Sequence, residues 1–102
     1  MLLAGDIGGT KTTLALVDQA TGPRMPLAQS TFRSADYPGL AEIALRFLRE
    51  QGAEVERACF GIAGPVLAGR ARLTNLAWSD LVEADLADAL HIPTVQLIND
   101  LE

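Results

Sequence analysis

Hydrophobic and polar positions alternate in the first third of the chain, as they do in β-strands. Leu2–Ala4 form a short apolar run that stops at Gly5, and in "TTLALVD" Leu14 and Leu16 alternate with smaller side chains. "MPLAQSTFR" mixes β-branched and polar residues, which is typical of a half-exposed strand. A turn over "DQATGP", Asp18–Pro23, separates these last two segments. We therefore predict three consecutive strands in an antiparallel meander.

The period changes to that of a helix in "PGLAEIALRFLREQG". Apolar residues recur here at i, i+3, i+4, i+7 and i+8, and this stripe comprises Leu40, Ile43, Ala44, Phe47 and Leu48. Pro38 is suited to open the helix and Gly52 to close it. Glu42 and Arg46 are four residues apart, so we expect them to pair across the exposed face.

Two further strands and a hairpin are predicted in the second half. "RACFGIAGPV" has the composition of a buried strand that ends at Gly64 and Pro65, and "VLAGRARLTN" that of a short hairpin that turns at Ala68 and Gly69. "TVQLI" is a short apolar strand, and it delivers Asn99 and Asp100 to its C-terminal edge.

A second helix is predicted over "WSDLVEADLADALHIP", which ends at Pro93. Ser79 and Asp80 are candidate caps, and Glu83 follows Asp80 at the spacing of a capping box. The inward stripe of this helix would comprise Val82, Leu86, Ala89 and Leu90. The resulting order is βββαβ, a small hairpin and αβ, which defines a single α/β unit with a mixed sheet.

Composition and charge exclude several classes of function. The formal net charge is −5 and no basic cluster is present, so neither a nucleic acid nor a membrane surface is an expected partner. No apolar stretch approaches the roughly 20 residues that span a bilayer. The start "MLLAGDIGG" lacks the features of a signal peptide, and the single Cys59 cannot form an internal disulfide. A soluble protein of the reducing cytoplasm is expected.

The stretch "GDIGGTKT", Gly5–Thr12, combines glycines with one acid and one lysine. A nucleotide P-loop needs GxxxxGK[ST] before a helix, but here Thr10 precedes Lys11 and a strand pattern follows. A dinucleotide fingerprint needs GxGxxG at the start of a helix, which the spacing of these glycines does not match. The pattern instead predicts a glycine turn between two antiparallel strands.

Two interpretations of this turn are open. Without side chains at Gly8 and Gly9, successive backbone N–H groups approach a phosphate closely, and Asp6 is suited to hold a hydrated Mg²⁺. Glycine pairs also form plain β-hairpins that bind nothing. The ending "LIND" also has two open interpretations. Asn99 and Asp100 are either functional groups at a strand end or caps of a following helix.

Four segments, "GDIGGTKTTLALVD", "FGIAGPV", "LTNLAW" and "LIND", occur in an order and spacing that resemble bacterial glucokinases. These belong to the superfamily of sugar kinases, Hsp70 and actin, and the resemblance covers essentially the whole chain. It implies a ribonuclease H-like, actin-like ATPase N-terminal domain. The implied activity is phosphorylation of the glucose 6-hydroxyl, with ATP and Mg²⁺ as cofactors.

The resemblance also implies a role for each site residue. The first phosphate loop would comprise Gly8, Gly9, Thr10 and Lys11, and Asp6 would face the Mg²⁺ through water. Asp100 would be the catalytic base that accepts the proton of the 6-hydroxyl. Asn99 would bind sugar hydroxyls beside it, and the loop around Thr74 and Asn75 would approach the sugar.

The ROK family of sugar kinases and repressors resembles the chain too, but its usual ending is closer to NDAN than to "NDLE". This difference favours the other group of bacterial glucokinases. A ROK repressor carries an N-terminal DNA-binding region, whereas Met1 here leads directly into the first strand, so a regulator is not expected. A ROK zinc site would lie beyond residue 102.

In glucokinases the second phosphate loop, the adenosine pocket and further sugar ligands come from later parts of the chain. We therefore expect residues 1–102 to be the N-terminal lobe of a two-lobed kinase, inactive without the C-terminal lobe. Its uncovered apolar surface predicts a homodimer or other self-association. The alternatives are a ROK-type kinase for another sugar and a non-catalytic ligand-binding or assembly module.

Several other residues are interpreted as structural. Cys59 lies in a buried strand without a base beside it, so packing is expected rather than nucleophilic chemistry. His91 would complement a helix dipole, and Arg70 and Arg72 would be solvent-facing charges. Trp78 is suited either to cover the sugar cleft or to pack at the start of the second helix.

Overall fold

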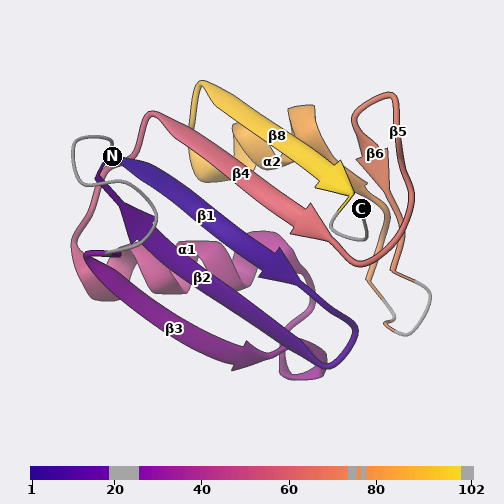
Figure 1. Ribbon diagram of the computed structural model, residues 1–102, viewed down its shortest axis with the longest axis horizontal. Coiled ribbons are helices and arrows are strands. Elements are labelled where there is room, and N and C mark those ends of the chain that lie inside the picture. Colours follow the sequence, from indigo (N-terminus) through magenta and orange to yellow (C-terminus); the bar gives the residue numbers. More distant parts are fainter. Residues whose placement is uncertain (19–25, 74–75, 77, 100–102) are drawn as a thin grey trace.

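The structure is a computed structural model that describes residues 1–18, 26–73, 76 and 78–99 (Figure 1). Its elements are β1 (Leu2–Ile7), β2 (Lys11–Val17), β3 (Ala28–Arg33), the 3-10 helix η1 (Ser34–Asp36), α1 (Leu40–Gln51), β4 (Arg57–Ile62), β5 (Val66–Leu67), β6 (Arg70–Ala71), β7 (Leu81–Val82), α2 (Glu83–Leu90) and β8 (Thr94–Asn99). The predicted order of strands, hairpin and helices is confirmed, with β7 as an addition. The predicted turn over Asp18–Pro23 lies mostly outside the described residues.

Five strands form one mixed sheet in the order β3-β2-β1-β4-β8. The first three strands pair antiparallel, as the predicted meander requires, whereas β4 and β8 run parallel to β1. Parallel strands need crossover connections, and α1 and α2 supply them. The C-terminal ends of β1, β4 and β8 therefore meet at one edge of the sheet (Figure 1).

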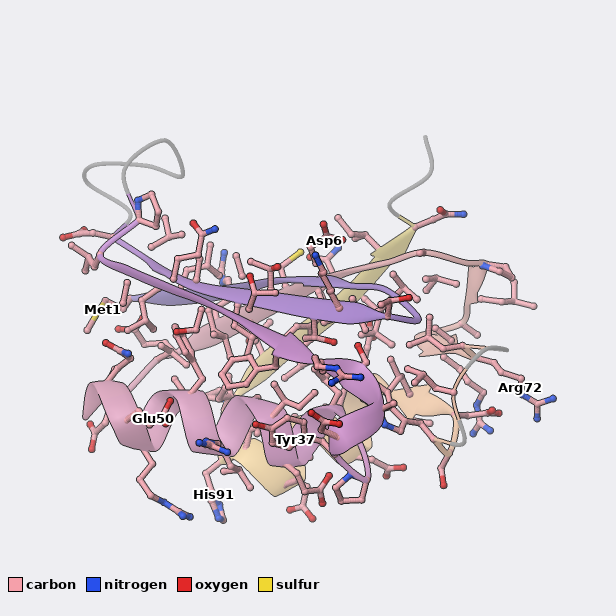
Figure 2. The ribbon with its side chains drawn as sticks, turned by 90° about the horizontal axis from the view of Figure 1, so that it is seen from below. Met1, Asp6, Tyr37, Glu50, Arg72 and His91 are labelled. Atoms are coloured by element: carbon pink, nitrogen blue, oxygen red, sulfur yellow. The ribbon has the colours of Figure 1, made fainter. Side chains whose placement is uncertain are left out.

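Both helices cover the same face of this sheet (Figure 2). The core between sheet and helices is apolar, and its largest fully buried side chains include Phe47, Phe60, Leu3, Ile7 and Leu14. The opposite face, which we call the open face, carries the alternate positions of the strands. Many of these are smaller or polar, among them Ala4, Asp6, Thr13, Cys59 and Gln96.

Helix α1 follows the predicted stripe, since Leu40, Ile43, Ala44 and Phe47 are all buried. It ends at Gly52, whose φ of 59° is the left-handed conformation that favours glycine at this position. The predicted pair between Glu42 and Arg46 is wrong. Arg46 Nε instead donates to Glu50 Oε2 at 3.2 Å, and Arg46 Nη1 donates to the Tyr37 hydroxyl at 3.0 Å.

Helix α2 begins later than the sequence predicts, at Glu83, and neither Ser79 nor Asp80 caps it. Residues 81–82 form β7 and pair with β6 instead. Asp80 is engaged elsewhere, because its Oδ1 accepts from Arg72 Nε at 2.8 Å. This hydrogen bond keeps the pKa of the Asp80 carboxyl below its ordinary value. The inward stripe is narrower than predicted, with Leu86 and Leu90 buried and Ala89 exposed.

A second, small sheet has the strand order β5-β6-β7. The predicted hairpin joins β5 and β6, and its two turn residues, Ala68 and Gly69, have φ values of 54° and 73°. Positive φ at both central positions is the signature of a type I′ turn, which matches the twist of the strands. This sheet lies beside the C-terminal edge of the large sheet (Figure 1).

Candidate phosphate-binding and sugar-binding site

The register of the parallel strands aligns the two candidate motifs. Ile7, the last residue of β1, lies opposite Ile62 of β4, and Ile62 lies opposite Asn99 of β8. Because adjacent strands are about 4.8 Å apart, Asn99 lies about 10 Å from Ile7 across the sheet. The glycine turn follows Ile7 directly, so the turn and Asn99 share one edge. Asp100, Thr74 and Asn75 lie outside the described residues.

The glycine turn connects β1 to β2 through Gly8, Gly9 and Thr10. Gly8 N–H donates to the Lys11 carbonyl at 2.9 Å, which closes the turn. Within the described part of the chain, the N–H groups of Gly9 and Thr10 donate to no backbone carbonyl. An anion is the ligand that such adjacent backbone amides suit. No helix follows the turn, which confirms that it is not a P-loop.

A pair of buried hydroxyls lies directly behind this turn. Thr12 and Ser34 are both fully buried, and their hydroxyl oxygens are 2.8 Å apart. Ser34 Oγ donates to the Gly8 carbonyl at 2.9 Å, and Ser34 N–H donates to the Thr10 carbonyl at 3.0 Å. Sequence analysis missed Ser34, because no feature of its own segment points to a turn so distant in the chain.

Charged side chains gather near the turn on the open face. Asp6 is exposed on this face, away from α1 (Figure 2), and lies opposite Thr13 of β2. Lys11 lies opposite Arg33 of β3, and both side chains are exposed. Like charges directly opposite each other are unfavourable in a sheet unless an anion offsets them. Arg33 therefore adds to Lys11 a second cation that sequence analysis did not single out.

The first glycine of "GDIGGTKT" has a different role from the other two. Gly5 lies inside β1, and a Cβ built on it would be 2.7 Å from Phe60 Cδ1 and 2.9 Å from Leu14 Cδ2. Both neighbours belong to the buried core. Gly5 is therefore glycine because the core approaches its backbone closely, and the turn itself uses only Gly8 and Gly9.

Asp6, the acid predicted to face Mg²⁺, does not belong to a cluster of metal ligands among the described residues. No group of three or more His, Cys, Asp or Glu side chains suited to a metal occurs among the described residues. Mg²⁺ usually keeps several waters and is bound through one or two carboxylates together with substrate phosphates. Asp6, exposed beside the glycine turn, fits such a site, in which most ligands come from water and nucleotide.

The residues interpreted as structural have structural contacts. Trp78 Nε1 donates to the Tyr37 carbonyl at 2.8 Å, and the half-buried ring packs against the core. Burial raises the pKa of the Cys59 thiol, which keeps it protonated and weakly nucleophilic. His91 is exposed and ends α2 with a φ of 56°. Arg72 pairs with Asp80, so it is not merely a solvent-facing charge.

Glu83 connects the small sheet to the strand that ends at Asn99. Its Oε2 accepts from the Leu97 N–H of β8 at 2.8 Å, and its own N–H donates to the Gly69 carbonyl at 2.9 Å. β8 is an edge strand, so this carboxylate satisfies a ladder donor that no neighbouring strand reaches. The sequence suggested only a capping residue at this position.

We expect Glu83→Ala to lower the free energy of unfolding by about 1 kcal/mol, because it leaves the half-buried Leu97 N–H without its partner. Asp85→Ala is the matched control, since Asp85 is an exposed acid in the same first helical turn. Urea unfolding of both variants measures the difference. Equal losses in the two variants would assign the effect to the helix dipole rather than to Leu97.

No helix in the described part of the chain is long and apolar enough to cross a membrane.

Comparison with known proteins connects this fold to one class of enzymes. The glucokinase of Nostoc punctiforme is 46% identical over 102 residues, which cover 98% of this chain and 30% of that protein. The crystal structure of a glucokinase from an Antarctic psychrotroph superposes with a TM-score of 0.82 at 32% identity, and the match covers 97% of this chain and 32% of that one.

A more distant structure shows the same fold. A ROK family glucokinase from Streptomyces griseus, solved in complex with glucose and AMPPNP, has a TM-score of 0.73 at 24% identity. The match covers 97% of this chain and 33% of that one. The chain thus has the ribonuclease H-like α/β fold of bacterial sugar kinases.

A profile of the glucokinase family matches residues 3–102. The chain belongs to the glucokinase family. It spans about 30% of the length of the curated relatives that it matches.

Proposed function

We propose that this chain is the N-terminal lobe of a two-lobed glucokinase, which transfers the terminal phosphoryl group of ATP to the 6-hydroxyl of glucose. The observation that carries the proposal is the shared edge of the sheet. The parallel register aligns Ile7 with Asn99, so the glycine turn follows the end of one strand and Asn99 ends another at the same edge. Such an edge is where open α/β sheets bind their ligands.

The nucleotide half of the proposed site is the glycine turn. The N–H groups of Gly9 and Thr10 donate to the phosphates, and Lys11 supplies positive charge beside them. Asp6 would hold a bound Mg²⁺ through water. When bound, the ion would supply positive charge that neutralises the transferred phosphoryl group. Phosphoryl transfer requires mainly positioning and charge neutralisation, and this side of the edge supplies both.

The sugar half of the proposed site follows β8. Asp100 accepts the proton of the glucose 6-hydroxyl as that oxygen attacks the phosphorus, and Asn99 orients the sugar through its hydroxyls. The loop that contains Thr74 and Asn75 is proposed to approach the same sugar. The further phosphate, adenosine and sugar contacts are proposed to come from a C-terminal lobe, and the enzyme is proposed to work in the cytoplasm.

The direct test is turnover by the full-length protein that carries this chain. We expect ADP formation that depends on glucose, ATP and Mg²⁺, measured by a coupled assay, and a panel of hexoses defines the preferred sugar. The isolated 102-residue chain is the control. It is expected to show no turnover, because it holds only one wall of the site, and light scattering tests its proposed self-association. Absence of ADP formation with every hexose would refute the proposed function.

A further inference from the structure

On the basis of that function, we propose that Ser34 is a positioning residue of the phosphate-binding turn. Ser34 contacts no substrate in this proposal. Its role is to hold the backbone of the turn in the orientation that presents amide protons to the nucleotide phosphates.

Ser34 holds the turn on both sides of Gly9. Its hydroxyl donates to the Gly8 carbonyl at 2.9 Å, and its N–H donates to the Thr10 carbonyl at 3.0 Å. Two contacts from one residue define the direction in which both of these carbonyls point. Glycines populate many backbone conformations, so a turn that contains Gly8 and Gly9 needs such external support to keep one of them.

Orienting these carbonyls also orients two donors. Every peptide bond in the described chain is trans, and in a trans peptide the N–H points opposite to the carbonyl of the same plane. The Gly8 carbonyl shares its plane with the Gly9 N–H, and the Thr10 carbonyl shares its plane with the Lys11 N–H. Since both carbonyls point toward Ser34, both N–H groups point away from it. The Gly9 N–H is one of the two proposed phosphate donors, and the Lys11 N–H directly follows the residue that carries the other, Thr10.

The buried pair fixes the direction of the Ser34 hydroxyl proton. A serine hydroxyl has one proton, and here the Gly8 carbonyl accepts it. The 2.8 Å contact to Thr12 must therefore use the Thr12 proton, so the hydrogen bonds run from Thr12 to Ser34 to Gly8. Both side chains are fully buried, where a hydroxyl without a partner is costly. The series of hydrogen bonds from Thr12 through Ser34 to Gly8 consequently has one favoured direction.

The test compares two variants of the full-length protein that each remove one hydroxyl of this pair. Ser34→Ala removes the hydroxyl contact to Gly8 and keeps the N–H contact to Thr10. Thr12→Val keeps both contacts and nearly keeps the shape of its own side chain. We expect Ser34→Ala to raise the Kd for Mg-AMPPNP about fivefold to tenfold, as loss of one positioning hydrogen bond does. We expect Thr12→Val to change it less than twofold, and both variants to leave the Kd for glucose unchanged. Isothermal titration measures these constants.

The thermal midpoint separates positioning from stability. Both variants lose a buried hydroxyl, and Ser34→Ala also leaves the buried Thr12 hydroxyl without its acceptor. We therefore expect Tm to fall in both variants, further in Ser34→Ala, and nucleotide affinity to fall in Ser34→Ala alone. If Ser34→Ala does not fold, Ser34→Cys keeps the volume with a much weaker donor and is expected to show the same loss.

Equal loss of nucleotide affinity in the Ser34 and Thr12 variants would overturn the proposal, as would unchanged affinity in the Ser34 variants. Failure of the proposed function would give a different result, because the wild-type protein itself would not bind Mg-AMPPNP. The role proposed for Ser34 would then be wrong as well.

Discussion

Replacing Asp100 by alanine in the full-length protein is expected to lower kcat by about 10²-fold to 10⁴-fold, the usual contribution of a general base. This corresponds to about 3 to 5 kcal/mol of transition-state stabilisation. The sugar hydroxyl attacks poorly while it keeps its proton, and the methyl group of alanine cannot accept that proton. Glucose binding should persist, since Asn99 and the proposed sugar contacts of a C-terminal lobe are unchanged. Steady-state kinetics and a glucose titration measure the two quantities.

Asp100→Asn and Asp88→Ala complete this experiment. The asparagine variant keeps the size of the side chain and one acceptor oxygen but removes its charge and basicity, so it should lose as much activity as the alanine variant. Asp88 is an exposed acid in α2, on which no step of the mechanism depends, and its replacement should leave kcat unchanged. Wild-type turnover in either Asp100 variant would exclude the residue as the base.

Gly5→Val is expected to lower the free energy of unfolding by about 3 kcal/mol, the upper part of the range for overpacked cores. Even the first carbon of a side chain would be 2.7 Å from the Phe60 ring and 2.9 Å from Leu14, and valine adds two methyl groups there. Both neighbours are fully buried, so neither side chain moves away without disturbing the core. Urea or thermal unfolding of the variant measures the loss.

Gly39→Ala is the matched control for this loss. A Cβ at Gly39 would meet only the end of the flexible Glu42 side chain, at 3.0 Å, and the backbone φ of −178° suits any residue. Its unfolding free energy should stay within about 0.5 kcal/mol of the wild type. If Gly5→Val had a similarly small effect, the strand would accommodate a side chain at this position. The close approach of Phe60 and Leu14 would then not be the reason for glycine.

Local patterns made much of this fold predictable. The stripe of α1, the alternation of β2 and the two turn residues of the β5–β6 hairpin depend on neighbours within a few positions, and each prediction is confirmed. The end of β8 at Asn99 agrees with its predicted place at a strand edge. The family resemblance, carried by four separated motifs, agrees with the matching family profile.

The features that sequence reasoning missed depend on contacts that the local pattern does not determine. Arg46 has a glutamate four residues away on each side, Glu42 and Glu50. It pairs with Glu50, and it also contacts the hydroxyl and the ring of Tyr37. Asp80 has the composition of a helix cap, but Arg72 binds it across the small sheet. Ser34 and Gly8 are 26 positions apart, so only the pairing of β2 with β3 brings them together.

The order of strands in the large sheet determines when each half of the edge assembles during folding. The glycine turn and its support at Ser34 belong to a meander within residues 1–34, whose short connections cost little loop-closure entropy. Asn99 reaches the same edge only after β4 and β8 have paired in parallel across α1 and α2. Local contacts form faster than distant ones, and domains are synthesised from the N-terminus. We therefore expect the proposed phosphate half of the edge to take shape on the nascent chain before the ribosome has made the strand that carries the proposed sugar half.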